Sequence, residues 1–394
     1  MSKSQQHAPG AAGETIRPVA ELFTTAAIGF WATTYSIDLA LFTEFLLDRL
    51  GEPPLNIAIL ADHHRLSASL ARVPADRADT LASANRRWLL RGASLGGQAF
   101  HPKSYLVVTA SRAALFVGSG NLTVDGIDAG DELFTVFRSG TPAGDAALGT
   151  WRAWMRRLIE MTGDPVLADR FRDLDARLPR PTAAAVTGSP LLHNLDAPIA
   201  SQLADRVRAD GRAVDELLLA APFYDHDAAA VGDLLGQLAP ARVRVFVTSS
   251  TSVNGALLAG RLASSGAAVT VSGYEPDRFV HAKLIGVISG TNGWLVSGSP
   301  NLSQAALSRT VADNGNAELA VVATCTPTAA RAAFIPPGTE VTESNLTDLE
   351  ALSFRADTEP GLPAVRLLSA ASTADGHITL VSDPPPSQAG SLMT

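Results

Sequence analysis

Short apolar runs alternate along the chain with segments whose apolar residues recur every three to four positions. The first pattern indicates buried β-strands and the second indicates amphipathic helices. In the first half of the chain these patterns predict a strand and turn at residues 26–35, a helix at 39–50, a buried strand at 55–61, and strands at 100–109, 114–117 and 133–137.

The second half repeats this order of elements. Alternating strands and helices are typical of an α/β sheet, mostly parallel, with antiparallel pieces near hairpins. The predicted elements are strands at 216–222, 241–247, 267–271, 279–288, 294–297 and 318–323, with a helix at 228–238.

Changes in composition divide the chain of 394 residues into five parts. An Arg-rich helical stretch is predicted at residues 150–178, and short strands are predicted near 365–368 and 377–381. The predicted parts are a disordered tail at 1–18, a first lobe at 19–180, a linker at 181–190, a second lobe at 191–326, and an acidic, Pro/Thr-rich, partly disordered extension at 327–394.

One motif occurs twice with the same internal spacing. His101-Pro102-Lys103 is followed by Gly118-Ser119-Gly120-Asn121, and His281-Ala282-Lys283 is followed by Gly298-Ser299-Pro300-Asn301. In both copies the asparagine comes 20 positions after the histidine, and the copies are 180 positions apart. Such self-similarity indicates an internal duplication.

The use of lysine sets the motif apart from the rest of the chain. The chain has three lysines among 31 basic residues, and two of them are Lys103 and Lys283, while Lys3 lies in the polar tail. A compact ammonium and a planar guanidinium are not interchangeable. The motif therefore demands an ammonium at this position.

Charge and composition exclude several classes of protein. The formal net charge of −8 argues against coating nucleic acid by bulk charge but permits a local basic site. The single Cys325 excludes an intramolecular disulfide framework and a Cys-rich zinc site. We expect no membrane span, because uninterrupted apolar runs of ~18 residues are missing, and the polar start lacks a signal-peptide core, which favours a cytoplasmic protein.

The repeated residue types suit chemistry on a phosphodiester. In an extended His-x-Lys segment both side chains point to one face, and the Gly-Ser-x-Asn turn adds short polar groups. One histidine can attack phosphorus to give a phosphohistidine, while the other protonates the leaving oxygen. Lysine, serine and asparagine would stabilise the phosphate oxygens, so we expect neither a metal nor another cofactor.

These motifs resemble those of the phospholipase D superfamily, which carries two copies of His-x-Lys followed by Gly-Ser-x-Asn. The resemblance covers about residues 20–325 and implies two pseudo-twofold-related lobes, each a mixed β-sheet flanked by helices, with the active site between them. Glu132 and Glu318 resemble family acidic residues that orient a histidine. The implied site comprises His101, Lys103, Asn121, His281, Lys283 and Asn301, supported by Ser119, Ser299, Glu132 and Glu318.

Two departures from the common family pattern favour one branch. Val108 and Ile288 stand where an aspartate is usual, and the span from His to Asn is three residues longer than usual. In both respects the chain resembles the tyrosyl-DNA phosphodiesterase and nuclease-like branches. This predicts a bacterial nuclease acting on DNA, in phage defence or restriction and repair. Because the acidic balance disfavours autonomous DNA binding, a helicase or ATPase partner would deliver the substrate; this sequence itself has no phosphate-binding loop.

Other readings of the sequence stay open. A phospholipase D or phosphatidyltransferase would act on lipid, and a scaffold subunit would keep the fold without activity. The serines could serve only the turns, and the glutamates could be ordinary surface carboxylates. Tyr35 and Tyr224 follow the first strand of each repeat as core or base-stacking residues, and His63 is expected in an exposed loop. RNA as substrate, the identity of the nucleophilic histidine and the oligomeric state are not decided by the sequence.

Overall fold

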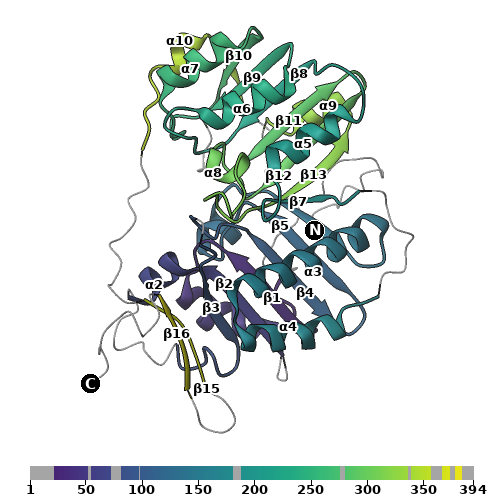
Figure 1. Ribbon diagram of the computed structural model, residues 1–394, viewed down its shortest axis with the longest axis vertical. Coiled ribbons are helices and arrows are strands. Elements are labelled where there is room, and N and C mark those ends of the chain that lie inside the picture. The colour runs from purple at the N-terminus through teal and green to yellow at the C-terminus, as the bar shows by residue number, and fades with distance from the viewer. Residues whose placement is uncertain are drawn as a thin grey trace, which may run out of the picture.

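The computed structural model describes residues 22–51, 55–71, 81–96, 98–180, 188–275, 280–335, 339–355, 366–372 and 378–383. They form two lobes stacked along the long axis of the molecule (Figure 1). The predicted tail at 1–18 and the end of the chain from residue 384 lie outside the described residues, as does most of the predicted linker.

The first lobe is built on a six-stranded mixed sheet with the order β3-β2-β1-β4-β5-β6. β1, β2 and β3 run parallel to one another, and β4, β5 and β6 continue the sheet in antiparallel pairs. The strands are β1 (Ala27–Thr34), β2 (Asn56–Asp62), β3 (Leu89–Ala93), β4 (Ser104–Thr109), β5 (Ala113–Gly118) and β6 (Phe134–Arg138). The helices are η1 (Leu41–Leu46), η2 (Leu47–Leu50), α2 (His63–Ala71), η4 (Asp125–Ala129), α3 (Pro142–Thr162) and α4 (Pro165–Arg177).

The second lobe is built on an eight-stranded sheet with the order β14-β10-β9-β8-β11-β12-β13-β7. Its strands are β7 (Leu191–His193), β8 (Glu216–Ala220), β9 (Arg242–Val247), β10 (Ala268–Gly273), β11 (Leu284–Ser289), β12 (Asn292–Gly298), β13 (Leu319–Cys325) and β14 (Thr342–Ser344). Its helices are α5 (Ile199–Arg208), α6 (Ala229–Leu238), α7 (Gly255–Ser264), α8 (Gln304–Leu307), α9 (Pro327–Ala332) and α10 (Leu346–Leu349).

The duplication is visible in the strand order. The run β3-β2-β1-β4-β5-β6 of one sheet corresponds to β10-β9-β8-β11-β12-β13 of the other, with the same parallel and antiparallel pairs. β7 and β14 extend the second sheet at its two edges. The predicted fold class, two related lobes each made of a mixed sheet flanked by helices, is confirmed.

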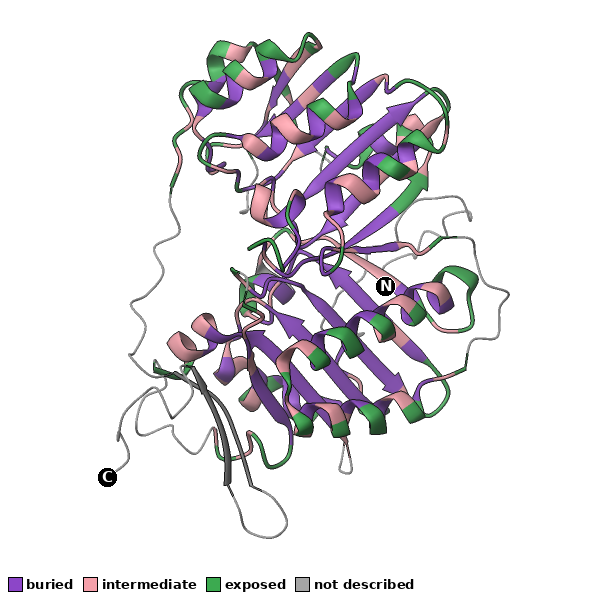
Figure 2. Cartoon of the chain, in the orientation of Figure 1, coloured by how far each residue is buried: buried purple, intermediate pink, exposed green. Residues whose placement is uncertain are grey.

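Helices pack on both faces of the first sheet. Its strands are mostly buried (Figure 2). Every residue of β2 is buried. The tryptophans Trp151 and Trp154 of α3 lie in the core of one face, and η1 and η2 cover the other face with Phe42 and Leu50.

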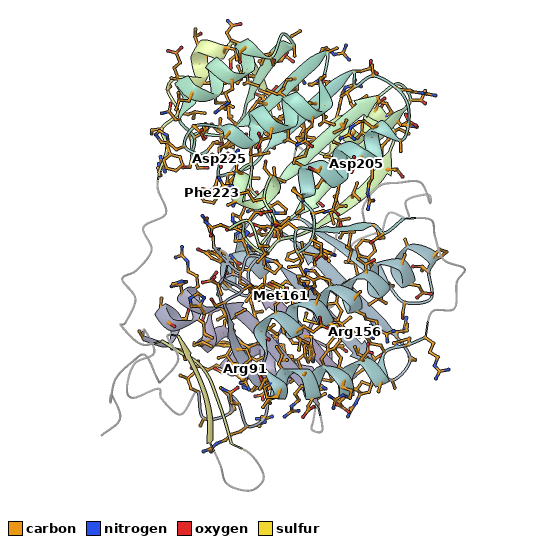
Figure 3. The ribbon with its side chains drawn as sticks, in the orientation of Figure 1. Arg91, Arg156, Met161, Asp205, Phe223 and Asp225 are labelled. Carbon is orange, nitrogen blue, oxygen red and sulfur yellow. The ribbon has the colours of Figure 1, made fainter. Side chains whose placement is uncertain are left out.

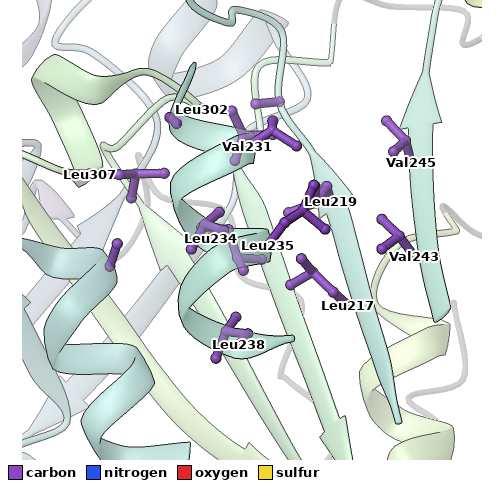
Figure 4. Packing of buried hydrophobic residues seen from close by; sticks show 14 of the residues in the cluster. Leu217, Leu219, Val231, Leu234, Leu235, Leu238, Val243, Val245, Leu302 and Leu307 are labelled. Carbon is purple, nitrogen blue, oxygen red and sulfur yellow. The ribbon is translucent and has the colours of Figure 1, made fainter. Parts of the chain in front are cut away.

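In the second lobe, α6 packs on β8 and β9 through one apolar stripe (Figure 4). Its buried residues Val231, Leu234, Leu235 and Leu238 recur at helical spacing. Leu302, which follows the motif residue Asn301, is buried in the same cluster. The core thereby anchors the second Gly-Ser-x-Asn turn.

The lobes share a hydrophobic core, which fixes how the two motifs face each other. One cluster contains Val117 of β5 together with Leu319 and Val321 of β13. Apolar packing at this junction makes the two lobes one unit rather than two domains on a tether.

Three sequence predictions need correction. The stretch 150–178 is two helices: α3 begins at Pro142 after the capping residue Thr141, and it ends at Gly163, whose φ of 64° is left-handed. Asp164 then caps α4. His63 is buried at the start of α2 rather than exposed in a loop. The predicted strands 100–109 and 279–288 are shorter, because β4 begins at residue 104 and β11 at residue 284.

The chain beyond residue 326 adds to both lobes. β14 pairs with β10 at the edge of the second sheet, and α10 packs against α7. The two-stranded antiparallel hairpin of β15 (Arg366–Ser372) and β16 (Ile378–Asp383) includes most of the two short strands predicted there, and it lies beside β3 and α2 (Figure 1). In the described part of the chain, every helix is too short or too polar to cross a bilayer.

Candidate active site

Each His-x-Lys segment leaves its own sheet and hydrogen-bonds to the other lobe. The His101 N–H donates to the carbonyl of Ala317 at 2.9 Å, and the His281 N–H donates to the carbonyl of Asp131 at 3.1 Å. These bonds replace ladder bonds within the home sheet, which is why β4 and β11 begin only after the lysines, at residues 104 and 284. They also place each histidine next to the residue that follows the accepting carbonyl, which is a glutamate in both cases.

The first histidine is held by a carboxylate of the opposite lobe. His101 Nδ1 lies 3.0 Å from the Glu318 carboxylate, which is fully buried. Glu318 is itself fixed, because it accepts hydrogen bonds from the Ser299 hydroxyl and, at 3.1 Å, from the Asn316 amide. The Asn194 side chain accepts from the Glu318 backbone N–H at 2.9 Å. Such outer partners fix the ring and its tautomer.

The second histidine is held in the same way from the first lobe. His281 Nδ1 lies 2.8 Å from Glu132 Oε1. Behind that carboxylate, the Ser119 hydroxyl accepts from the Leu133 N–H at 3.0 Å, as Ser299 accepts from Leu319 at 3.0 Å. Both serines are fully buried, and their hydroxyls accept from the backbone N–H of the residue that follows each glutamate.

The two lysines are buried beside their own histidines. Lys103 Nζ donates to the His101 carbonyl at 2.8 Å, and Lys283 Nζ donates to the His281 carbonyl at 2.7 Å. An ammonium has three donors, so each lysine keeps two for other partners. Burial lowers the pKa of Lys103 well below its usual range, and the charge of Lys283 lowers it further. Burial also lowers the pKa of Lys283 to about 7.

Burial and the lysine charges favour neutral imidazoles. Burial lowers the pKa of His281 to about 4, with help from the charge of Lys283 and against the pull of Glu132. Burial lowers the pKa of His101 as well, although the nearby Glu318 carboxylate works to raise it. Burial alone would raise the pKa of both carboxyls, but the bonds and charges of the histidines and lysines bring it below the ordinary value. A neutral imidazole that donates from Nδ1 keeps a lone pair on Nε2.

The two motif asparagines occupy equivalent turns but differ in their partners. Asn121 Oδ1 accepts from the backbone N–H groups of Tyr35 and Ser36, at 3.3 and 3.4 Å. Asn301 Oδ1 is buried and has no hydrogen-bond partner. The residue that corresponds to Tyr35 in the second lobe is Pro222, which has no N–H and so cannot supply one of these two donors.

This correspondence corrects the sequence alignment of the repeats. Ile37 bridges Leu122, and Tyr224 bridges Leu302, at the same motif position. Tyr224 therefore matches Ile37, not Tyr35, and it is buried.

The aromatic residues that contact the histidines are Tyr35 and Phe223. The Tyr35 ring lies edge-on to His101 with a centroid distance of 4.9 Å, and the Phe223 ring lies edge-on to His281 at 6.2 Å. Arg65 donates to the Tyr35 hydroxyl at 2.7 Å and lies over its ring. The sequence pattern gave no sign of Phe223, Arg65, Asn194 or Asn316 as site residues.

The structure thus gathers both histidines, both lysines and both glutamates at the junction of the lobes. Charges interact across this junction: the charge of Lys283 lowers the pKa of His101, and the charge of Lys103 lowers the pKa of His281. Groups of three or more metal-ligating side chains are absent from the described residues. The side chains of His101 and His281 are 10% and 16% exposed, so each ring is nearly enclosed.

Comparison with known proteins finds likeness in structure alone. No family model matches the sequence, and no curated protein matches it. A mutant of the yeast tyrosyl-DNA phosphodiesterase has a similar fold, with a TM-score of 0.50 and 12% identity over 79% of this chain and 84% of that chain.

Two further solved structures align over much of the chain. A phosphatidylserine synthase from Haemophilus influenzae Rd KW20 gives a TM-score of 0.49 and 14% identity over 84% of this chain and 86% of that one. A polyphosphate kinase from Porphyromonas gingivalis gives 0.46 and 12%, over 87% of this chain and 48% of that one. The chain therefore shares the overall fold of the yeast tyrosyl-DNA phosphodiesterase.

Proposed function

We propose that the chain is a metal-independent phosphodiesterase that works through a phosphohistidine intermediate. The observation that carries the proposal is the pair of imidazoles, each held at Nδ1 by a carboxylate of the opposite lobe. This arrangement leaves Nε2 of each ring for phosphorus or for a leaving oxygen. The proposed catalytic residues are His101, Lys103, Asn121, His281, Lys283 and Asn301.

The proposed reaction has two steps. In the first, Nε2 of one neutral histidine forms a bond to phosphorus while the bond to the leaving oxygen breaks, and the other histidine, whose imidazolium form the bound anionic phosphodiester favours, gives that oxygen a proton. In the second, this now neutral histidine takes a proton from water, the water oxygen bonds to phosphorus, and the phosphorus–nitrogen bond breaks. The ammonium groups of Lys103 and Lys283 stabilise the charge on the non-bridging oxygens.

Glu132 and Glu318 act in both steps as positioning residues. A carboxylate at Nδ1 stabilises the imidazolium that forms when Nε2 takes a proton or a phosphoryl group. Because both carboxylates are buried, this interaction is weakly screened by solvent.

For the substrate we favour DNA. Two features support this choice: the motif aspartate is replaced by Val108 and Ile288, and a DNA phosphodiesterase has a similar fold. The acidic net charge of −8 gives weak autonomous attraction to DNA, so we propose a bacterial nuclease of phage defence or restriction and repair. It would act in the cytoplasm, where a helicase or ATPase partner delivers the substrate.

The proposal is tested by assays in EDTA with supercoiled DNA, single-stranded DNA, RNA and phosphatidylcholine vesicles. We expect DNA cleavage that persists in EDTA, disappears in His101→Asn and survives in the control His226→Asn, which alters an exposed histidine. Choline release without DNA cleavage would replace the nuclease by a lipid-acting enzyme. A wild-type protein that turns over none of these substrates would favour the scaffold.

A covalent intermediate gives a second readout. A substrate labelled in the phosphate should leave acid-labile label on one histidine after rapid denaturation, and mass spectrometry of the peptides containing residues 101 and 281 identifies which one. Turnover without any labelled histidine under single-turnover conditions would contradict the phosphohistidine mechanism.

A further inference from the structure

One exposed aromatic ring lies against the site. Phe223 is 40% exposed. Its ring contacts the motif histidine His281. Figure 3 shows Phe223 at the side of the second lobe that faces the first. Exposing an aromatic ring forfeits the stabilisation that burial would give, and this ring is exposed directly beside His281, where a bound substrate can cover it.

The backbone around Phe223 is fixed on both sides. The Phe223 carbonyl accepts from the Leu302 N–H at 3.2 Å. Its neighbours Pro222 and Tyr224 are buried, and both are hydrogen-bonded to Ser252, at 2.8 and 3.1 Å. The ring therefore projects from a rigid segment, which lowers the entropy cost of holding a ligand against it.

Tyr35, the aromatic residue beside the histidine of the first lobe, lies close to two cations. Arg65 lies over the Tyr35 ring at 4.8 Å from its centroid, and Lys103 Nζ lies 5.4 Å from it. Tyr35 also has its hydroxyl bound by Arg65. Two cations thus lie close to the Tyr35 ring, and Phe223 is 40% exposed. The two half-sites are thus chemically different despite the duplication.

We propose that Phe223 stacks against an unpaired nucleobase next to the scissile phosphate, so that the preferred substrate is single-stranded nucleic acid. The inference rests on the proposed function and names its substrate class. A phenyl ring has no hydrogen-bonding group, so it would hold any base with little sequence preference. Bases within a duplex are already paired and stacked, so they would have to be unstacked before they could lie on Phe223.

Fluorescence binding tests this with the cleavage-silent variant His101→Asn as the parent. The probe is a single-stranded oligonucleotide of about 12 nucleotides with 2-aminopurine at successive positions, titrated in EDTA. We expect quenching at one position of the probe. Adding Phe223→Ala should remove that quenching and weaken binding about 5- to 100-fold, as for loss of one base–aromatic stack. Phe223→Trp should retain both, while Phe223→Leu should behave like alanine.

The control is Phe45→Ala, which removes another exposed ring, 60% exposed on η1, and should leave binding unchanged. Equal binding by the parent and its Phe223→Ala derivative would overturn the inference. It would also be overturned if Phe223→Leu bound as tightly as the parent, or if the parent bound a duplex more tightly than the single strand. Cleavage by the wild type separates the two proposals. If quenching depends on Phe223 but the wild type cleaves nothing, only the enzymatic proposal is refuted. If the wild type cleaves and Phe223→Ala changes neither cleavage nor binding, only the stacking role is refuted.

Discussion

His101 of the first lobe is bound through Nδ1 by Glu318 of the second, a residue 217 positions further along the chain, at 3.0 Å. The reverse pair joins His281 and Glu132, 149 positions apart, at 2.8 Å. Each half of the site therefore takes its histidine and lysine from one lobe and its carboxylate from the other. Neither lobe alone contains a complete half-site.

The first prediction concerns these carboxylates. Glu318→Gln keeps the shape of the side chain but removes the charge that stabilises the His101 imidazolium. We expect kcat to fall about 10- to 100-fold with a much smaller change in KM, as for other partners that orient a reactive group. Glu132→Gln should act in the same way through His281. Steady-state kinetics checks this, with the surface variant Glu343→Gln as control; an unchanged kcat in Glu318→Gln would remove the positioning role.

The second prediction concerns the buried ammonium. Lys103 is fully buried and donates to the His101 carbonyl. In Lys103→Arg the charge is kept, but the wider guanidinium does not fit an enclosed site shaped for a compact ammonium. We expect kcat/KM to fall at least about 100-fold, equivalent to about 2.7 kcal/mol of transition-state stabilisation.

Kinetics and a thermal melt check the Lys103→Arg result together. The exposed replacement Arg112→Lys is the matched control, and it should leave both unchanged. Full activity in the folded Lys103→Arg protein would show that charge alone suffices.

The third prediction concerns the pH dependence of kcat/KM, which we expect to be higher below about pH 7 than above it. The pKa of His281 is about 4, so the ring is neutral above that pH. The pKa of Lys283 is about 7, so its ammonium loses its proton, and its ability to stabilise phosphate oxygens, as the pH rises through 7. We expect kcat/KM to decline above about pH 7. A profile from pH 4 to 9 on an oligonucleotide checks this, and a rate that stays level up to pH 9 would contradict the role of Lys283.

The fourth prediction uses the two asparagines as each other's control. Asn121→Ala deprives two backbone donors of their acceptor and should lower the free energy of unfolding by about 1–3 kcal/mol. Asn301→Ala removes a buried oxygen that has no donor, so it should lower the free energy of unfolding by clearly less. Urea unfolding of both variants measures the difference. Equal losses of stability would show that the two turns are held alike.

Much of this architecture could be read from local sequence. The duplicated spacing predicted two equivalent lobes, because a repeated pattern of strands and helices builds the same sheet twice. The apolar runs located most strands, since a strand covered on both faces needs apolar residues throughout. The strands at 100–109 and 279–288 were predicted too long, because the N–H groups of His101 and His281 bond to the opposite lobe, and no local pattern records such a bond.

The matching of Tyr35 with Tyr224 failed for a related reason. Chain order suggested the pair, but register is set by which backbone groups pair, and Leu122 and Leu302 pair with Ile37 and Tyr224. The consequence is that Pro222 replaces Tyr35, which removes one possible donor to Asn301, and that Phe223 lies beside His281.

The sequence by itself determined the residue types of the site and their equivalence, because a duplicated motif preserves the chemistry that each copy needs. Only the tertiary structure decided which partner each histidine receives. Apolar packing of β5 against β13 brings the two sheets together, and backbone bonds from His101 and His281 cross that junction. Glu132 and Glu318 reach the histidine of the other lobe because they follow the accepting carbonyls, a relationship between residues too distant in sequence for any local pattern to encode.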